Sequence, residues 1–387
     1  PFSGGGKFGA RAATLSTRRH LETNRLRYRS RTMTIPFGHS ALSLWHLDPD
    51  ITYLNHGTVG ATPKRVLEAQ QRLRDEIERQ PARFLLRELA GEAGRYDLPE
   101  PRLRTAARAV AEFLGAKAQD LVFVENATAG VNAVVRSFDF REGDEILVPD
   151  LGYGGVVRAI TLVARECGAV VVPVTLPFPP ASDDPSPYVD AYVNAVTSRT
   201  RMALVDHITS ETALILPLRE ITAALQARGV AVLVDAAHAP GSIPVDIASY
   251  GADWYTANLH KWAFAPRASA ILWAAPERQA GLRPANTSWG LDAGFPREFD
   301  WAATHDPTNA LAAPEGVAFL RDLGEQNVYG HNHALIWHAG HVLTKRWGGT
   351  ISTPESWIGC MMAIPLPESL GSTRPEAQKL RDALLYE

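Results

Sequence analysis

The stretch VAVLVDAAHAPGSIPVDIASYGADWYTANLHK, residues 230–261, decides the fold class of this chain. It opens with the apolar run Val230–Val234 and turns polar at Asp235. A second run, Asp253–Thr256, leads into the polar sequence NLHK at 258–261. Short runs that are apolar on both faces are typical of strands buried inside a parallel sheet. The stretch therefore predicts two buried strands, each followed at its carboxyl end by polar side chains.

The same pattern recurs on both sides of this stretch. Similar apolar runs occupy residues 121–124, 144–148, 169–174, 201–205 and 268–273, with helical patterns such as 155–167 and 217–228 between them. Alternating strands and helices predict an α/β fold, in which a mainly parallel seven-stranded sheet lies between two layers of helices.

Patterns outside this alternation predict three further elements. We expect an amphipathic helix over 63–88, a strand over 357–365 and a C-terminal helix over 374–387.

The composition restricts the class of protein. The chain has 387 residues and is 45% hydrophobic, which suits two folded domains and excludes wholesale disorder. It lacks an uncharged apolar run long enough to cross a membrane. Two cysteines cannot form a disulfide framework, so we expect a reducing, cytoplasmic setting.

The charge is unevenly distributed along the chain. Residues 1–32 hold eight basic residues and one acidic residue, a net charge of +7, which leaves −10 for the rest. An acidic body argues against a nucleic-acid partner. The basic arm has three interpretations: sequence upstream of a start at Met33, an organelle transit peptide, or a basic binding arm. We expect it to lie outside the fold.

Polar residues follow five of the predicted strands. They begin at Asn126, Asp150, Asp206, Asp235 and Asn258. Ligands of open parallel sheets bind beyond the carboxyl ends of the strands. This convergence is the strongest functional signal in the sequence.

The residue types indicate the ligand. Ala127-Thr128 opens a helix whose free N–H groups suit a phosphate, and Tyr153 could stack on a flat ring. Asp235 could keep a ring nitrogen protonated. Lys261, in an apolar setting, could form a Schiff base. Together these features predict pyridoxal phosphate.

Six stretches resemble the class V aminotransferase family of fold-type I pyridoxal phosphate enzymes, and its isopenicillin N epimerase-like branch most of all. They are YLNHGTVG at 53–60, ENATAG at 125–130, DLGYG at 150–154, VDAAHAPG at 234–241, NLHK at 258–261 and WAATHDPT at 301–308. The resemblance implies a large cofactor domain over 60–290. It implies a smaller α+β domain, short at its C-terminal end, from 33–59 and 291–387.

The resemblance also implies a role for each matching residue. Lys261, Asp235 and His238 would be catalytic. Ala127, Thr128, Asn258 and His260 would hold the phosphate, Tyr153 would stack on the ring, and Ser210, or else Thr209, would approach the ring hydroxyl. Asn55 and His56 would face the substrate. Thr304, which follows Ala303 where the family has glycine, would reach the phosphate of a neighbouring subunit, so a homodimer is expected.

The reaction stays open at this point. Removal of an α-proton begins epimerisation, C–S bond cleavage and transamination alike, and we expect an epimerase, with a lyase or aminotransferase as alternatives. A non-catalytic cofactor-binding homologue is a further alternative. Cys360 lies in an apolar run, which disfavours a persulfide-forming desulfurase.

Two other sets of residues could bind a ligand. The resemblance implies an arginine that binds the substrate carboxylate; the unassigned candidates are Arg83, Arg87, Arg95 and Arg267.

The histidines at 331, 333, 338 and 341 have no spacing that suits a metal, so no metal is expected.

Overall fold

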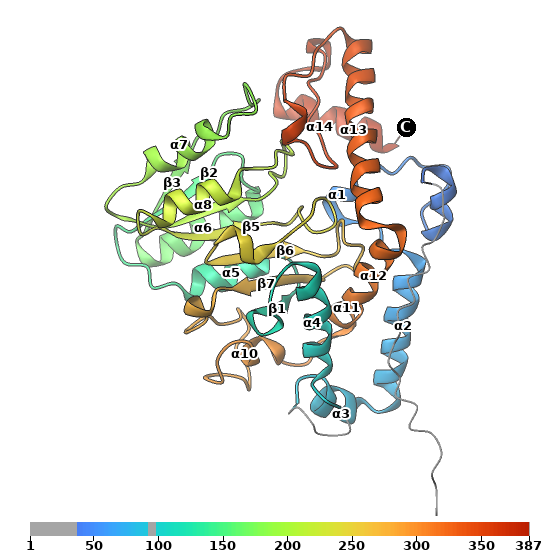
Figure 1. Cartoon of the computed structure of the whole chain (residues 1–387), viewed down its shortest axis with the longest axis vertical. Coiled ribbons are helices and arrows are strands. Elements are labelled where there is room, and N and C mark those ends of the chain that lie inside the picture. Colours follow the sequence, from blue (N-terminus) through green and yellow to red (C-terminus); the bar gives the residue numbers. More distant parts are fainter. Residues whose placement is uncertain (1–36, 92–97, 387) are drawn as a thin grey trace, which may run out of the picture. The chain divides into compact units, whose positions relative to one another are not determined.

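The computed structural model describes residues 37–91 and 98–386, which belong to one compact unit. The basic arm and Arg95 lie outside the described residues. Within the described part, a single seven-stranded sheet has the order β1-β7-β6-β5-β4-β2-β3 (Figure 1). Its strands are β1 Leu121–Val124, β2 Glu145–Pro149, β3 Val170–Val174, β4 Thr200–Asp206, β5 Ala231–Asp235, β6 Trp254–Asn258 and β7 Ala270–Ala274.

The sheet is mainly parallel, as predicted. Strand β7 runs antiparallel to both of its neighbours, β1 and β6, whereas β6, β5, β4, β2 and β3 are parallel to one another. The carboxyl ends of β2, β4, β5 and β6 therefore meet at one edge of the sheet.

Helices cover both faces, so the fold has three layers. The helices are α1 His56–Val59, α2 Lys64–Arg79, α3 Pro81–Arg83, α4 Arg102–Phe113, α5 Ala127–Ser137, α6 Gly154–Cys167, α7 Ser186–Ala195, α8 Leu218–Gln226, α9 Ile247–Tyr250, α10 Arg297–Asp300, α11 Thr308–Leu311, α12 Ala313–Leu323, α13 Glu325–Trp347 and α14 Arg374–Tyr386. One core packs α4, α7 and α8 on the sheet, and a second packs α5 and α6 on the other face.

The strand pattern explains the two cores. Along β5, Val232 and Val234 belong to the α7/α8 core, whereas Ala231 and Leu233 belong to the α5/α6 core. Successive side chains of a strand point to opposite faces, so a strand covered on both sides must be apolar throughout. This is the pattern on which the fold prediction depended.

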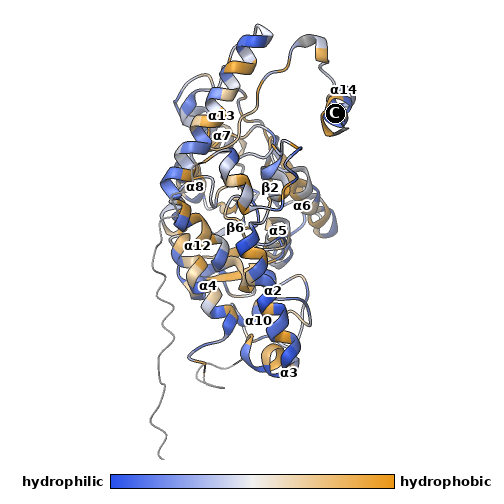
Figure 2. Cartoon of the chain, turned by 90° about the vertical axis from the view of Figure 1, so that its right-hand side faces the viewer, coloured by the Kyte–Doolittle hydropathy of each residue, from blue (hydrophilic) through white to orange (hydrophobic). Residues whose placement is uncertain are grey.

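A third core joins the site to the helices of the C-terminal part. Val66 of α2, Phe319 of α12 and Tyr329 of α13 pack around Phe264, three residues after Lys261. Figure 2 shows α12 as largely hydrophobic, whereas hydrophilic and hydrophobic residues alternate along α13. The predicted division of this unit into a large and a small domain stays a prediction.

Two predicted elements were wrong in detail. The helix expected over 63–88 ends at Arg79, because Pro81 cannot continue its hydrogen bonds, and a short π-helical turn follows at Phe84–Glu88. The strand expected over 357–365 is absent from the described residues; only Ile358 forms an isolated bridge, to Leu214. The C-terminal helix is confirmed as α14.

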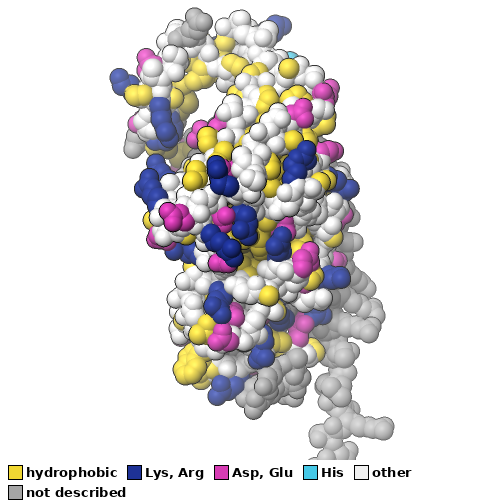
Figure 3. Space-filling model, turned by 90° about the vertical axis from the view of Figure 1, so that its left-hand side faces the viewer, with side chains coloured by type: hydrophobic (Ala, Val, Ile, Leu, Met, Phe, Trp, Pro, Cys, Tyr) yellow, Lys and Arg dark blue, Asp and Glu magenta, His cyan; other side chains and the backbone are white. Residues whose placement is uncertain are grey.

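The surface charge and the lengths of the helices bear on whether nucleic acid or a membrane could be a partner. In Figure 3, basic and acidic side chains are interspersed on the visible face. Within the described residues, no helix combines the length and hydrophobicity needed to span a membrane.

Candidate active site

A cavity of about 690 Å³ lies at the carboxyl-end edge of the sheet. Its wall brings together most of the residues predicted from sequence, from both sheet and loops. These are Asn55, Ala127, Thr128, Tyr153, Ser210, Asp235, His238, Asn258, His260 and Lys261. Residues that are far apart in the sequence therefore meet at one place, because their strands end there.

Three predicted residues do not line this cavity. His56 Nε2 donates a hydrogen bond to the Lys261 carbonyl at 2.9 Å, so His56 supports the lysine's backbone. The Thr209 side chain is buried in a turn, where its hydroxyl accepts from the Leu214 N–H at 2.8 Å. Thr304 is exposed in its own chain. Their predicted roles toward the ligand stay predictions.

Lys261 is buried beside a histidine. Only 8% of the residue is exposed, and its Nζ lies 3.0 Å from His238 Nε2. Burial lowers the pKa of Lys261 from 10.5 to about 8, although the charge of Asp235 opposes this shift. A lysine with such a pKa has a substantial neutral fraction at pH 7–8, as a nucleophile or base requires.

His238 completes this contact and carries an unsatisfied atom. Burial, and secondarily the charge of Lys261, lowers the pKa of His238 to about 3, so the ring is neutral. With Nε2 facing the lysine ammonium, Nδ1 carries the ring proton. Among the described residues this buried Nδ1 has no hydrogen-bond partner. A buried donor without an acceptor is costly and points to a ligand that supplies one.

Asp235 ends β5 and is also buried. Its Oδ1 accepts the Ala237 N–H at 3.0 Å. Burial raises the pKa of Asp235, while that hydrogen bond and then the charge of Lys261 favour the ionised form. A cationic ring nitrogen would supply a further stabilising partner.

The start of α5 presents free donors. Asn258 Oδ1 accepts the Ala127 N–H and Asn126 Oδ1 accepts the Ala129 N–H, both at 2.9 Å. Within the described part of the chain, the Thr128 N–H and hydroxyl have no hydrogen-bond partner. These donors, at the positive end of a helix of eleven residues, suit a phosphate group.

His260 lies close to these donors in a defined tautomer. Its Nδ1 donates to the Ser269 carbonyl at 2.9 Å, so Nε2 is unprotonated while the ring is neutral. Burial lowers the pKa of His260. Protonation beside a bound phosphate dianion would turn Nε2 into a donor.

Two backbone segments, around Gly60 and His260, pack directly against each other at this site. Gly60 has φ +67°, and a Cβ there would lie 2.0 Å from the His260 carbonyl oxygen. Only glycine fits both the conformation and the space, so the segment around Asn55 can pack directly on the lysine loop.

The donor set fits pyridoxal phosphate. Free N–H and hydroxyl groups at a helix start match a phosphate, a buried carboxylate matches the ring nitrogen, and a buried amine matches the aldehyde. The unpartnered His238 Nδ1 adds a donor for an oxygen of the ligand. Fold and site together define a lysine-dependent cofactor enzyme of the α/β class.

Comparison with known proteins gives the family. The chain belongs to the class V aminotransferase family, whose model matches residues 52–354. Members of this family are pyridoxal phosphate enzymes, so the predicted family and cofactor are confirmed.

Relatives in the family differ in their reactions. The chain is 33% identical over 346 residues to putative L-cysteine desulfhydrase 1 of Oryza sativa subsp. japonica, covering 84% of this chain and 69% of the relative. It is also 33% identical over 340 residues to isopenicillin N epimerase of Streptomyces clavuligerus, covering 83% and 82%. The epimerase prediction is thus confirmed only as far as a pyridoxal phosphate enzyme of this family.

A solved structure supports the fold. A mutant of C-DES with glycine covalently linked to its pyridoxal phosphate cofactor superimposes with a TM-score of 0.63 at 20% identity. The match covers 74% of this chain and 76% of that one. This likeness agrees with the predicted α/β architecture.

The cavity wall also contains residues to which the sequence assigned no role. They are Leu54, Gly57, Thr58, Asn126, Asp206, Ile208, Ala237, Trp262, Ile336, Cys360, Met361 and Met362. Asn126 and Asp206 were among the strand-end residues that the sequence singled out, but neither received a role of its own. The residues at 360–362 could not be found from sequence, because their run was interpreted as a strand.

Arginine is absent from the part of the cavity wall that the described residues form. Arg267 donates to the Gly60 carbonyl at 3.1 Å, and Arg83 pairs with Glu88 at 2.5 Å. Arg87 lines a separate cavity. None of these three predicted candidates for binding the substrate carboxylate lines the site, and the described residues contain no group of side chains suited to a metal.

Proposed function

We propose that this chain is a pyridoxal phosphate-dependent C–S lyase, which eliminates sulfide from L-cysteine or a related β-thio amino acid. One observation carries the proposal: Lys261 is the one general base that the described cavity wall presents in a usable pKa range. Elimination needs one base on one face of the substrate, whereas epimerisation needs a base on one face and a proton donor on the other.

The other titratable groups of the wall are poorly suited to take an α-proton. His238 has a pKa of about 3 and already faces Lys261. Burial raises the pKa of Cys360 to about 12, so its thiol is not a base near neutral pH. Neutral His260 keeps a free Nε2, but we assign this nitrogen to the phosphate of the cofactor and not to the substrate.

The proposed chemistry uses Lys261 twice. When bound, pyridoxal phosphate supplies an electron sink that makes the Cα–H bond of an attached amino acid acidic. Neutral Lys261 takes this proton, the electrons of the Cα–H bond expel sulfur from Cβ, and Lys261 returns the proton to the leaving sulfur. Hydrolysis of the remaining fragment gives pyruvate and ammonia, so cysteine and water yield sulfide, pyruvate and ammonia.

The wall at 360–362 suits a sulfur-bearing side chain. Met361 and Met362, which carry polarisable thioethers, line the cavity together with Ile336 and Trp262. Cys360 Sγ lies 2.8 Å from Ser242 Oγ. Because the thiolate form is disfavoured there, we expect sulfur to leave as sulfide and not as a persulfide on the enzyme.

The direct test is to incubate the purified holoenzyme with L-cysteine in heavy water. The proposal expects equal amounts of sulfide and pyruvate, formed at a steady rate. α-Deuterated cysteine without sulfide would overturn it. A colourless protein that takes up no pyridoxal phosphate would also overturn it, whereas a yellow protein that exchanges no α-proton of any amino acid would favour the non-catalytic cofactor-binding alternative.

Epimerisation is the second candidate because of Tyr153. This residue lines the cavity at the start of α6 and is half exposed, so its phenol could donate a proton from a second direction. The 33% identity to the epimerase agrees with this reaction. Tyr153→Phe keeps the ring but removes the hydroxyl, and it should abolish epimerisation while slowing elimination only a few-fold.

A homodimer is part of the proposal. Ala303 has φ +88°, the left-handed conformation for which the family uses glycine, and it presents the exposed Thr304. A partner subunit could use this hydroxyl at its phosphate site. Light scattering of the purified protein tests the dimer, and Thr304→Val should then weaken cofactor binding. The cytoplasmic location stays a prediction.

A further inference from the structure

The cavity contains a second buried aspartate that the proposed chemistry does not use. Asp206 ends β4 and is the register partner of Asp235 on the adjacent parallel strand β5. Both residues are at least 97% buried, and both line the cavity. Residues at matching positions of neighbouring strands lie about 5 Å apart.

Both carboxyl groups lie on the same face of the sheet. Met202 and Leu204 precede Asp206 at alternate positions and pack in the α5/α6 core. Leu233 does the same before Asp235. By this alternation both carboxyl groups point to the side on which α5 begins.

The two aspartates have unequal partners. Asp235 accepts the Ala237 N–H at 3.0 Å and faces the charge of Lys261. Among the described residues, Asp206 Oδ2 is buried without any hydrogen-bond partner. An ionised carboxylate is stable beside a donor and a cation, but not where it has neither.

Three further ionisable groups near Asp206, within the described residues, have hydrogen-bond partners of their own. Tyr192 of α7 donates its hydroxyl hydrogen to the Leu204 carbonyl at 3.0 Å. Asp150, after β2, is exposed and accepts the Leu176 N–H at 3.1 Å. His207 points to the opposite face, where its Nδ1 lies 2.9 Å from the Tyr255 hydroxyl.

We propose that Asp206 carries a proton and donates it as a hydrogen bond to ionised Asp235, which makes Asp206 a positioning residue for the group that holds the cofactor ring nitrogen. Two adjacent buried carboxyl groups share one proton, because like charges at this distance cannot both ionise. Burial, followed by the charge of Asp235, raises the pKa of Asp206 well above its ordinary value, in agreement with the proposal. Only the functional consequence rests on the proposed role of Asp235.

The proton itself is tested by infrared spectroscopy of the cofactor-free protein at pH 8. Wild type should show the carbonyl band of a buried carboxylic acid, and Asp206→Asn should lose it. Asp300 is a matched control: burial raises its pKa to about 6, so it is ionised at pH 8 and Asp300→Asn should keep the band. No band in wild type, or a band that survives in Asp206→Asn, would overturn the proposal.

Cofactor binding tests the positioning role. Asparagine keeps a neutral N–H donor of the same size, so Asp206→Asn should bind pyridoxal phosphate within about threefold of wild type. Asp206→Leu has no donor and should raise Kd about tenfold and shift the pH dependence of the cofactor's absorbance. Equal losses in both variants would mean that Asp206 binds the ligand as an anion, and would overturn the proposal.

Failure of the proposed function gives a different result. If Asp235 does not hold the ring nitrogen, Asp235→Asn will leave both the cofactor's Kd and its absorbance unchanged. The infrared band of Asp206 would still decide whether the two carboxyl groups share a proton.

Discussion

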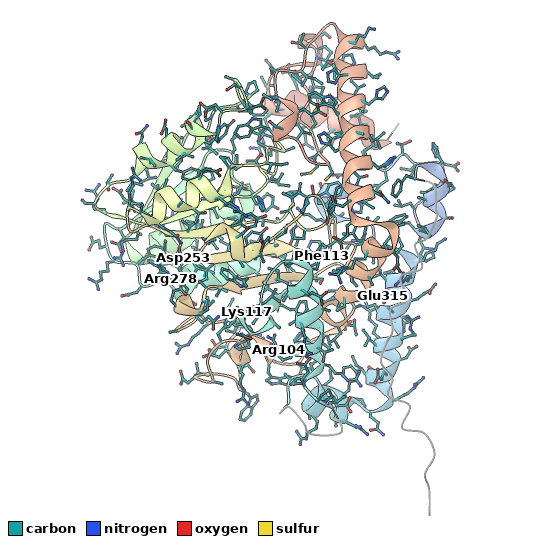
Figure 4. All side chains as sticks on the ribbon, viewed as in Figure 1. Arg104, Phe113, Lys117, Asp253, Arg278 and Glu315 are labelled. Atoms are coloured by element: carbon teal, nitrogen blue, oxygen red, sulfur yellow. The ribbon has the colours of Figure 1, made fainter. Side chains whose placement is uncertain are left out.

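Buried acidic residues at the two ends of the parallel strands differ in the number of their hydrogen-bond partners. At the edge where the parallel strands begin, Asp253 accepts from Arg278 Nε at 2.5 Å, from the Val232 N–H at 2.7 Å and from Gln226 at 3.2 Å. Figure 4 shows Asp253 and Arg278 side by side. At the edge where these strands end, Asp206 and Asp235 are equally buried but have few partners.

This difference separates structural acids from functional ones. A buried carboxylate with a full set of donors is already satisfied and can only stabilise the fold. A buried carboxyl with vacant positions costs stability until a ligand supplies the missing partner. Burial alone therefore does not indicate a site; burial with missing partners does.

The largest effect is expected at the ligand edge, for Lys261→Ala. Loss of the base should reduce sulfide release about 10³-fold or more. The free energy of unfolding should not fall by more than about 1 kcal/mol, because Lys261 is buried and, among the described residues, only neutral His238 lies within hydrogen-bond distance of its amine. Steady-state sulfide release and urea unfolding of the cofactor-free protein measure the two effects.

Lys117→Ala is the matched control for that variant. Lys117 is exposed after α4, far along the chain from the lysine loop, and is labelled in Figure 4. Its loss should leave both sulfide release and unfolding unchanged. Equal activity in the two variants would contradict the assignment of Lys261.

Asp235→Asn and Asp253→Asn should have opposite effects on activity and on stability. The first should lower activity about 10²-fold with little change in stability, because Asp235 has few partners to lose. The second should destabilise the protein by about 2–4 kcal/mol, because three donors lose their charged acceptor. Activity is measured at saturating cofactor, and stability is measured as the urea midpoint. If both variants lose similar amounts in both assays, the proposed difference between the two ends of the strands is wrong.

Much of the fold and site followed from local patterns. Strands such as β5 are apolar on both faces, and polar residues follow them, which is visible in the sequence without any partner. Lys261 and Asp235 could be placed together because parallel strands end at one edge.

The rest depended on contacts that local patterns do not contain. The run at 357–365 is apolar because Trp357 packs in a core and residues 360–362 line the cavity, and apolar composition alone does not distinguish this from strand pairing. The hydrogen bond from the His56 ring to the backbone of residue 261, 205 residues away in sequence, could not be predicted, and the expected role of His56 toward the substrate stays a prediction. The isolated state of Asp206 Oδ2 is likewise a property of packing.

A smaller effect concerns the pH dependence of stability at the two edges. Hydrogen bonds from Thr197, followed by Arg199 and Thr200, lower the pKa of Glu145, which begins β2. This stabilisation is present above the ordinary glutamate pKa and is lost as pH falls through the lowered value. Glu145→Gln should therefore cost about 1–2 kcal/mol at pH 7, and the cost should shrink as pH falls below the ordinary glutamate pKa.

Asp206→Asn should show the opposite trend. Its raised pKa means that the native state binds a proton that the unfolded chain releases, so wild type loses stability as pH rises above the ordinary aspartate value. Relative to wild type, the variant should gain stability as pH rises above the ordinary aspartate pKa. Urea unfolding of the cofactor-free protein across this range measures both trends, and parallel curves would contradict the contrast.

The smallest effect is expected at the ligand edge itself, for Cys360→Ala. Cys360 lines the cavity, yet burial raises the pKa of its thiol to about 12 and its Sγ is engaged with Ser242. An enzyme that carried sulfur on this thiol would lose nearly all turnover, whereas a lyase that releases sulfide should change less than about threefold. Met361→Leu, which keeps the volume of its neighbour, provides the comparison for packing alone. A cysteine variant far less active than the methionine variant would mean that Cys360 carries sulfur, even though burial disfavours its thiolate form.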